Sequence, residues 1–398
     1  MNQKNNNSPI SGVTAFQFIL LMGIVSLFGD ITYEGARSIT GPFLAVLGAG
    51  AGIVGLVAGV GEFIGYAVRI ISGYLSDRTR AYWIFVIIGY GLIFSIPFLA
   101  FANHWKLAIF LIILERVGKG IRAPARDAIL SHVTKNIGRG IGFGIHEALD
   151  QIGAIIGPMI FSVVFFLKGD YRDGFIILTI PAFLCMAILL LARSKVPSPE
   201  RMEFLPSEHD DNSEKKRSLT RVFWFYSIFT FLSCVGFLNF QLISYHFKLI
   251  VIMPDAQIPM FYAIAMGIDA LSAIISGRMY DRFGLITLLV IPFISLFIPL
   301  LSLSHVYYFT ISGIILWGIA MGLHETIMRA GIADLTHPER RGIAYGIFNT
   351  IYGGAWLLGG ILMGLLYDLS IKYLILFAIS FQLLSIPFLF ITVRYSKL

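Results

Sequence analysis

The chain has 398 residues, of which 57% are hydrophobic and only 13% carry a formal charge, and its mean hydropathy is +0.80. Soluble domains carry about a quarter charged residues, so this composition excludes an ordinary soluble protein and indicates one embedded in a lipid bilayer. The formal net charge of +7 does not indicate nucleic-acid binding, because Lys and Arg occur in short segments between apolar runs rather than in one basic domain.

The residue inventory also argues against several chemistries. Cys185 and Cys234 both lie inside apolar runs, so neither a disulfide framework nor a cysteine metal site is indicated. No phosphate-binding loop, nucleophile elbow or zinc-protease motif occurs. We therefore expect no cofactor, no metal site and no enzymatic activity. The polar start of the chain is followed by an apolar run without a small-residue cleavage site, so no cleaved signal peptide is expected.

Twelve apolar runs are long enough to cross about 30 Å of hydrocarbon, which takes roughly 20 helical residues. The sequence therefore predicts an all-α membrane protein with twelve transmembrane helices in two pseudo-symmetric six-helix bundles. The predicted helices span residues 14–39, 47–72, 81–101, 106–130, 140–167, 173–193, 221–250, 259–279, 284–303, 306–332, 342–367 and 372–392.

A long polar stretch separates the two sets of helices. It predicts an N-terminal bundle at 1–193, a linker at 194–220 and a C-terminal bundle at 221–398. Most Lys and Arg outside the helices lie at the termini, in the linker and in every second loop. By the positive-inside rule, both termini and the linker are expected in the cytoplasm, with the protein in the plasma (inner) membrane.

The two halves repeat short motifs at nearly constant offsets. The segment from Gly73 to Asp77 and Arg78 is echoed, 204 residues later, by Gly277 with Asp281 and Arg282. A second segment, Arg139-Gly-Ile-Gly-Phe-Gly-Ile, is echoed 202 residues later from Arg341. These matches indicate duplication of a six-helix unit.

With twelve helices, a middle linker and a G-x-x-x-D-R motif after helices 2 and 8, the chain resembles the major facilitator superfamily over essentially its whole length. The resemblance implies that this motif pins helix ends together when the cytoplasmic side is closed. The gating residues it implies are Gly73, Asp77, Arg78, Gly277, Asp281 and Arg282.

Helices 4 and 5 are similar to motifs of proton-coupled drug exporters in that superfamily. Helix 4 keeps Arg116 of the R-x-x-Q-G-x-G pattern but replaces the glutamine with Lys119 and the second glycine with Arg122. Helix 5 has the G-x8-G-x3-G-P spacing, which ends in Gly157-Pro158. Such spacing predicts close packing, here expected against helix 8, and a hinge formed by Gly153, Gly157 and Pro158.

Helix 1 carries charges that are costly at mid-bilayer, at least about 2.5–3.5 kcal/mol each, unless they face water or a partner. Asp30, Glu34 and Arg37 are spaced by four and three residues and share a helical face. Arg116 of helix 4 lies at a similar depth, so we predict that it pairs with Asp30 or Glu34. The pair is either a static ion pair or a proton-coupling site in which protonation frees the arginine.

Further polar residues are candidates for binding a substrate. Glu115, Lys119, Arg122 and Arg126 form a stripe along helix 4, in which Glu115 and Lys119 are expected to neutralise each other. On helix 5, a polar group either neutralises this stripe or forms a polar site. In the second half, candidates follow from the resemblance, which implies that helices 1, 4, 7 and 10 line the cavity. The predicted substrate-binding residues are Arg37, Lys119, Arg122, His146, Glu147, Asp150, Asn239, Tyr245, Trp317 and Glu325.

The leading hypothesis is secondary active transport of a small organic solute by a monomer, through alternating access, with proton antiport driving export. The runner-up is uptake or exchange of an anionic solute, because Lys119 and Arg122 add positive charge where exporters of cationic drugs have neutral residues. A third hypothesis is a receptor that binds without translocating. The two copies of the gating motif argue against it, since a static receptor does not need them.

Overall fold

The computed structural model describes residues 12–134, 139–197, 219–337 and 340–396, and all regular structure among them is helical. The expected linker at 194–220 falls mostly outside these residues. α7 ends at Lys195 and α8 begins at Arg221, next to the predicted boundaries of the two bundles.

The six predicted N-terminal crossings are present. Two of them are broken: the third changes to a 3-10 form after Gly91, and the sixth restarts at Thr179. The elements are α1 (Gly12–Val46), α2 (Ala51–Thr79), α3 (Tyr82–Gly91) with η1 (Leu92–Ser95) and η2 (Pro97–Phe101), α4 (Trp105–Thr134), α5 (Arg139–Phe166), and α6 (Tyr171–Ile177) with α7 (Thr179–Lys195).

The C-terminal half repeats this order of crossings, so the prediction of twelve transmembrane helices is confirmed. Its first crossing is broken before Asn239, which caps the second part by accepting a hydrogen bond from Leu242 N at 2.9 Å. The elements are α8 (Arg221–Val235) with α9 (Phe240–Ile250), α10 (Gln257–Phe283), η4 (Gly284–Leu289) with α11 (Val290–Ser295) and α12 (Phe297–Ser302), α13 (Tyr307–Leu335), α14 (Arg341–Leu369) and α15 (Ile371–Ser396).

Most observed helices are longer than the predicted apolar runs. α1 continues to Val46 and α2 to Thr79, because a helix does not stop where the hydrocarbon ends. By length and apolarity, ten spans in the described residues qualify as membrane-crossing, one of which, Gln257–Ser302, contains two crossings. α4 is not among the ten, because its central turns carry too many charges.

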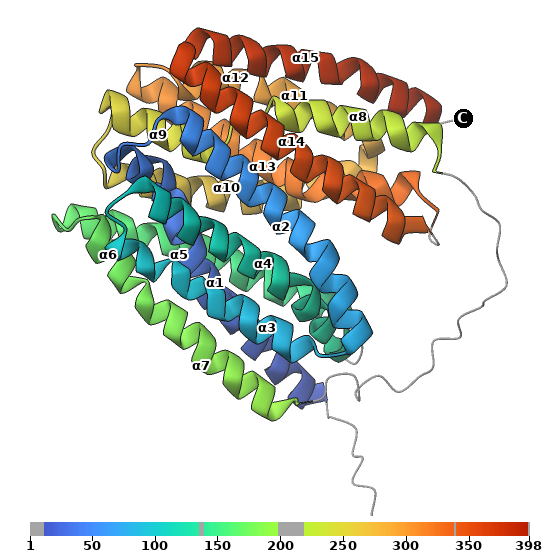
Figure 1. Cartoon of the computed structure of the whole chain (residues 1–398). Coiled ribbons are helices and arrows are strands. Elements are labelled where there is room, and N and C mark those ends of the chain that lie inside the picture. The colour runs from blue at the N-terminus through green and yellow to red at the C-terminus, as the bar shows by residue number, and fades with distance from the viewer. Residues whose placement is uncertain (1–11, 135–138, 198–218, 338–339, 397–398) are drawn as a thin grey trace, which may run out of the picture.

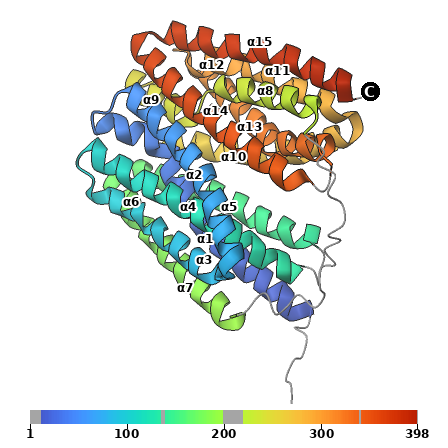
Figure 2. The same cartoon turned by 45° about the vertical axis from the view of Figure 1, so that its right-hand side comes forward.

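The two bundles lie side by side in both views and diverge toward one end of the molecule (Figures 1 and 2). We call this end, where α1 begins and α15 ends, the terminal face, and the opposite end the far face. The halves meet along two seams, one between α2 and α14 and the other between α5 and α10, and α1 also packs against α9.

The α2–α14 seam depends on glycines spaced four residues apart in both helices. A Cβ added at Gly360 would lie 2.6 Å from Gly55 O, and one at Gly59 would lie 2.8 Å from Trp356 O. One at Gly364 would lie 2.6 Å from Ala51 O. Only residues without a side chain allow the two backbones to approach this closely.

The far face is also joined by a carboxylate. Asp368, at the end of α14, accepts hydrogen bonds from Ala51 N at 3.0 Å and Gly52 N at 2.8 Å, the first backbone amides of α2. These amides have no partner within their own helix, and the positive end of the helix dipole favours an anion there. The contact therefore fastens the C-terminal half to the N-terminal half at the far face.

The terminal face has the opposite character. Asp77 and Arg78 in the last turn of α2, and Asp281 and Arg282 in the last turn of α10, are all exposed. Arg78 contacts Tyr74 of its own helix and Arg282 lies over the ring of Phe283, so neither arginine reaches the other half. Gly73 lies 3.5 Å, measured from an added Cβ, from Pro124 of α4 within its own half. The structure is closed at the far face and open at the terminal face.

Candidate functional site

A cavity of about 580 Å³ lies between the two bundles and extends from mid-helix toward the terminal face. Its volume is in the range that accommodates small-molecule ligands. Residues of α1, α2, α4, α5, α10, α13 and α14 line it, and the lining is unusually rich in charge. The charged lining residues are Asp30, Glu34, Arg37, Glu62, Arg69, Arg116, Lys119, Arg126, Asp127, Glu147, Asp150, Asp269, Glu325 and Arg329.

Four of these side chains form a ladder of alternating charge across α1, α2 and α4. Glu62 Oε1 lies 3.2 Å from Arg116 Nη1 and 3.4 Å from Arg37 Nη2. Arg37 Nη1 in turn lies 3.4 Å from Glu34 Oε1. Glu62 therefore bridges two arginines, and each charge of the ladder has an opposite charge beside it.

The ladder corrects the predicted pairing of Arg116 with Asp30 or Glu34. Arg116 pairs instead with Glu62, a residue that was absent from the predicted site. The sequence did contain a signal, because Glu62 is the only charged residue between Ala51 and Val68 of α2. A lone carboxylate in an apolar run is a candidate functional residue in a membrane helix.

Glu34 also connects the two halves of the molecule. Its Oε2 accepts a hydrogen bond of 2.6 Å from the hydroxyl of Tyr262 on α10. Glu34 is only 6% exposed, so this contact is largely shielded from solvent. A change in the charge of Glu34 would thus act on a contact between the bundles.

Lys119 and Asp30 line the same cavity without such a partner. Lys119 Nζ lies 4.1 Å from the centroid of the Tyr33 ring, and Arg116 lies over the same ring at 4.6 Å. Among the described residues, no ion pair joins either Lys119 or Asp30 to an opposite charge. Lys119 is therefore not neutralised by Glu115, contrary to the sequence-based expectation.

The partner of Glu115 is Arg122, at 3.1 Å. Arg122 also donates to Gly89 O at 3.4 Å and lies over the ring of Tyr90. Both charged side chains are almost fully buried inside the N-terminal bundle, and Arg122 is not part of the cavity lining. The structure thus places this predicted substrate-binding residue in an ion pair within α4, from which it also donates to α3.

One turn further along α4, Arg126 meets the polar residues of α5. Its guanidinium lies 2.9 Å from Asp127, 3.9 Å from Asp150 and 3.1 Å from the hydroxyl of Ser26. His146 Nδ1 lies 3.4 Å from Asp150, and its Nε2 lies 2.9 Å from Ser26. Asp150 and His146 therefore form a network around Arg126, whereas Glu147 is exposed to the cavity.

α5 packs against α10, the eighth crossing, as predicted, but its glycines Gly153 and Gly157 face α1. A Cβ at Gly153 would lie 2.6 Å from Leu27 O, and one at Gly157 would collide with Ile31 O and lie 2.7 Å from Gly35 N. Pro158 follows directly inside α5. The closest approach at these glycines is thus within the N-terminal bundle, although α10 packs on another side of α5.

The C-terminal half contributes a smaller charged group. Asp269 on α10 is only 3% exposed, and its Oδ1 has no hydrogen-bond partner among the described residues. Glu325 and Arg329 follow each other by one turn on α13 and both line the cavity. An unpartnered carboxylate at such depth is costly and marks a site where a proton or a cationic group is expected.

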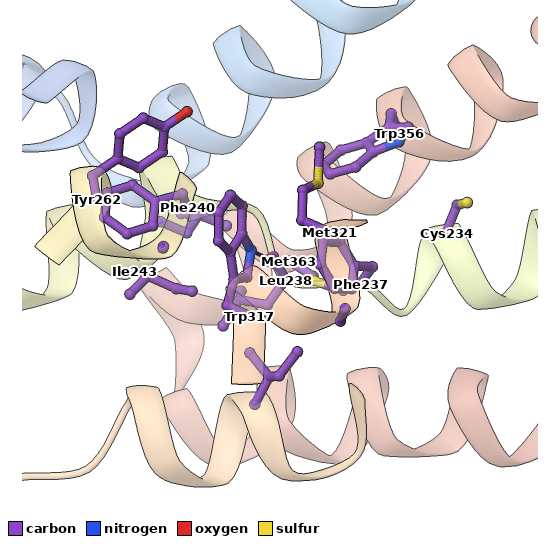
Figure 3. Close-up of a cluster of buried hydrophobic side chains, with 14 of the residues drawn as sticks. Cys234, Phe237, Leu238, Phe240, Ile243, Tyr262, Trp317, Met321, Trp356 and Met363 are labelled. Atoms are coloured by element: carbon purple, nitrogen blue, oxygen red, sulfur yellow. Dashed lines mark hydrogen bonds between the residues drawn. The ribbon is translucent and has the colours of Figure 1, made fainter. Parts of the chain in front are cut away.

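Four predicted substrate-binding residues lie outside the cavity lining: Arg122, described above, and Trp317, Asn239 and Tyr245. Trp317 is 1% exposed, donates to Leu238 O at 2.9 Å and packs between the rings of Phe237 and Phe240 (Figure 3). Asn239 is the cap of α9, and Tyr245 packs against Tyr367 near the far face. The aromatic residues that do line the cavity are Tyr33, Tyr66, Phe143, Tyr352 and Trp356.

Comparison with known families gives a clear match. The family model described as Major Facilitator Superfamily matches residues 13–359 and 253–398. A protein of Mycobacterium tuberculosis described as uncharacterised is 40% identical over 381 residues, which are 95% of this chain and 93% of that protein. An uncharacterised MFS-type transporter of Methanocaldococcus jannaschii is 31% identical over 397 residues, 96% of both chains.

A shorter match and several solved structures agree with this grouping. The class B tetracycline resistance protein of Escherichia coli is 32% identical over 96 residues, 24% of each chain. The crystal structure of a nucleoside transporter, NupG, superposes with a TM-score of 0.74 at 14% identity and covers 95% of this chain and 99% of its own. A peptide transporter also gives a TM-score of 0.74 at 14% identity, covering 96% and 95%. At these identities the likeness concerns the fold.

Proposed function

The chain belongs to the major facilitator superfamily and is a multi-pass membrane transporter of a small-molecule substrate; from this premise we propose that it exports a small polar solute in exchange for protons. The bundles at 1–193 and 221–398, joined by the 194–220 linker, rock about the central cavity. By the positive-inside rule the terminal face is cytoplasmic. The described conformation then corresponds to the state that takes up a solute from the cytoplasm.

The proposed proton coupling rests on the ladder of Glu34, Arg37, Glu62 and Arg116. Protonation of Glu62 removes the negative charge between two arginines, which then repel each other or bind another anion. Protonation of Glu34 alters its hydrogen bond with Tyr262 and so acts on the contact between the halves. Proton binding at the ladder is thus coupled to the equilibrium between the two conformations.

Asp30 is the third proposed proton carrier. It lines the cavity one turn from Glu34, has no ion-pair partner in the described residues and can exchange a proton with the water of the cavity. Export is favoured because helices 4 and 5 are similar to exporter motifs and because the short match to a tetracycline resistance protein points the same way. Uptake or exchange of an anion is the second candidate, favoured by the unpaired Lys119.

The test is proton movement in proteoliposomes. We expect that adding a transported solute changes the internal pH, measured with a trapped pH-sensitive dye, and that Asp30→Asn with Glu34→Gln and Glu62→Gln abolishes the change. Lys372→Gln, a substitution at the exposed start of α15, serves as the control. Proton movement that persists in the triple variant would overturn the proposed coupling. Solute binding without any flux would instead favour a receptor.

A further inference from the structure

The charges that line the cavity are sorted by sign between its two sides. The side formed by α2 and α4 carries four cations and two carboxylates: Arg69, Arg116, Lys119, Arg126, Glu62 and Asp127. The side formed by α5 and α10 carries three carboxylates and no lysine or arginine: Glu147, Asp150 and Asp269. Because α2 meets α14 at one seam and α5 meets α10 at the other, the two groups line opposite sides of the cavity, and they meet where Arg126 lies 3.9 Å from Asp150.

α13 contributes one charge of each sign, Glu325 and Arg329, which lie one turn apart and both line the cavity. Because the lining of α2 and α4 carries mostly cations and that of α5 and α10 carries carboxylates, the cavity has a positive side and a negative side, both accessible to one small molecule.

On each side, at least one charge forms no ion pair among the described residues. Lys119 on the positive side lies over the face of Tyr33, and no opposite charge lies within salt-bridge distance of it in the described part of the chain. On the negative side, Asp269 is 3% exposed with an unsatisfied Oδ1, and Glu147 forms only a 3.5 Å contact with Gln151. Charges held at this depth without a partner are costly, so a ligand that neutralises them gains binding free energy.

A solute with a single charge satisfies one side of this cavity and leaves the other unpaired. We propose that the substrate is a small zwitterion, whose anionic group binds at Lys119 and whose cationic group binds at Asp269 and Glu147. This inference rests on the proposed transport function and specifies its substrate class. The aromatic rings of Tyr33, Tyr66, Tyr352 and Trp356 in the lining suit a solute with an apolar or aromatic body. The charges of Glu34, Arg37, Glu62 and Arg116 pair with one another and remain available for proton coupling.

The first experiment measures binding to the purified full-length protein by isothermal titration calorimetry with two matched series. The first contains phenylalanine, hydrocinnamate, which lacks the ammonium group, and phenethylamine, which lacks the carboxylate. The second contains the dipeptide Phe-Ala, its N-acetyl form and its amide. We expect at least one zwitterion to bind about tenfold more tightly than both of its single-charge analogues. Equal or tighter binding of an anion or cation in the responding series, or no binding of either zwitterion at about 10 mM, overturns the proposal.

Variants then locate the two sides. With Lys119→Gln, we expect the zwitterion to bind no more tightly than its cationic analogue but still more tightly than its anionic analogue. With Asp269→Asn and Glu147→Gln together, we expect the zwitterion to bind no more tightly than the anionic analogue but still more tightly than the cationic one. Lys372→Gln should leave all three affinities unchanged. Binding of the zwitterion no more tightly than either analogue, in each variant, would indicate damage to the whole site and contradict the assignment of the sides.

Proton movement separates this inference from the proposed function. A single-charge solute that binds best and drives proton movement in proteoliposomes would refute the zwitterion and leave proton-coupled transport standing. A zwitterion that binds best but is transported without protons would refute the coupling and leave the substrate class standing.

Discussion

At the scale of single residues, the central feature is Glu62, which holds two arginines at a depth where neither is stable alone. Its side chain is 20% exposed and those of Arg37 and Arg116 are 11% and 7% exposed, so water of the cavity screens the ladder only in part. Removal of one partner from such a group leaves a buried charge unpaired. The stability lost in this way is greater than the stability that the intact pair contributes. The ladder is therefore sensitive to single substitutions and tolerant of paired ones.

Glu62→Gln is the substitution that tests this. We expect it to destabilise the protein by about 2 kcal/mol, less than the about 3–5 kcal/mol of a fully enclosed pair, because Glu62 retains contact with the cavity. The measurement is the apparent Tm in detergent. Adding Arg116→Gln to Glu62→Gln should recover part of the lost stability, and a double variant less stable than either single variant would contradict the pairing.

The ion pair of Arg122 and Glu115 makes a different prediction, because it lies outside the cavity. Arg122→Gln is expected to cost about 3–5 kcal/mol of stability, since it leaves Glu115 buried and unpaired. Glu115→Leu combined with Arg122→Met, which replaces both charges by apolar groups of similar size, should restore most of the apparent Tm. The affinity of this double variant for its solute should be unchanged. A loss of affinity without a loss of stability would show that Arg122 does bind the substrate.

At the scale of elements, the far face is held by helix ends rather than by side-chain pairs. Asp368 binds the free amides at the start of α2, and the glycines of α2 and α14 bring the backbones into contact below it. Both interactions must break when the far face opens. They therefore contribute to the preference for the described conformation and not to the stability of either bundle alone.

Asp368→Ala is accordingly expected to shift the conformational equilibrium. Loss of a carboxylate cap costs about 1–2 kcal/mol, which corresponds to a factor of about 5 to 30 in the populations. Spin labels at the exposed positions Val46 and Leu369, on the far face of the two halves, should report longer distances. Asp170→Ala is the matched control, because Asp170 caps α6 within the N-terminal half, where it accepts a hydrogen bond from Asp173 N.

Ala51→Pro tests the same contact from the other side. Proline lacks the amide hydrogen that Asp368 accepts, yet it fits the first position of a helix, and Gly50 already has the extended backbone that precedes a proline. We expect the distance between the two spin labels to lengthen, but by less than with Asp368→Ala. An unchanged distance distribution in both variants would show that the contact does not hold the far face.

At the scale of the whole molecule, we propose that the repeated motifs of α2 and α10 act in the conformation opposite to this one. Asp77, Arg78, Asp281 and Arg282 are exposed and contact no residue of the other half among those described. Their proposed role is to join the halves at the terminal face once the far face has opened. Alternating access then exchanges one set of helix-end contacts for another.

Asp77→Ala with Asp281→Ala is expected to leave the apparent Tm unchanged and to slow solute transport in proteoliposomes several-fold. The reason is that both carboxylates are exposed in the described state and are needed only in the opposite one. In the spin-label experiment, this double variant should increase the population with a short distance between the labels at Val46 and Leu369. Full transport activity in this double variant would contradict a gating role for the motif.

The sequence was sufficient for the architecture and less so for the site. Apolar length predicts twelve helices reliably, because the thickness of the bilayer fixes how many residues are needed to cross it. Partners of charged residues depend on the rotation of each helix about its axis, which hydropathy does not determine. This is why Arg116 was assigned to helix 1 rather than to Glu62, and why Trp317 was expected in the cavity rather than in the aromatic cluster beside Phe237 and Phe240.

Two features could have been found from the sequence by a closer look. Glu62 is an isolated charge in an apolar helix, and the spacing of Gly55 with Gly59 and of Gly360 with Gly364 is a known signal for close contact of membrane helices. What the sequence could not supply is that these two glycine pairs contact each other, across more than three hundred residues. That contact depends on the symmetric docking of the two bundles.

The charge of α4 also has a consequence for how the protein is made. Glu115, Arg116, Lys119 and Arg122 lie in the central turns of this helix, and each basic residue there opposes entry into lipid by about 2.5–3.5 kcal/mol. We expect α4 to enter the bilayer together with its neighbours rather than as an isolated segment. Glu115 neutralises Arg122 within α4 itself, but Arg116 needs Glu62 of α2, and Arg122 also donates to the carbonyl of Gly89 on α3. We therefore infer that the N-terminal half is assembled by the joint release of these three helices.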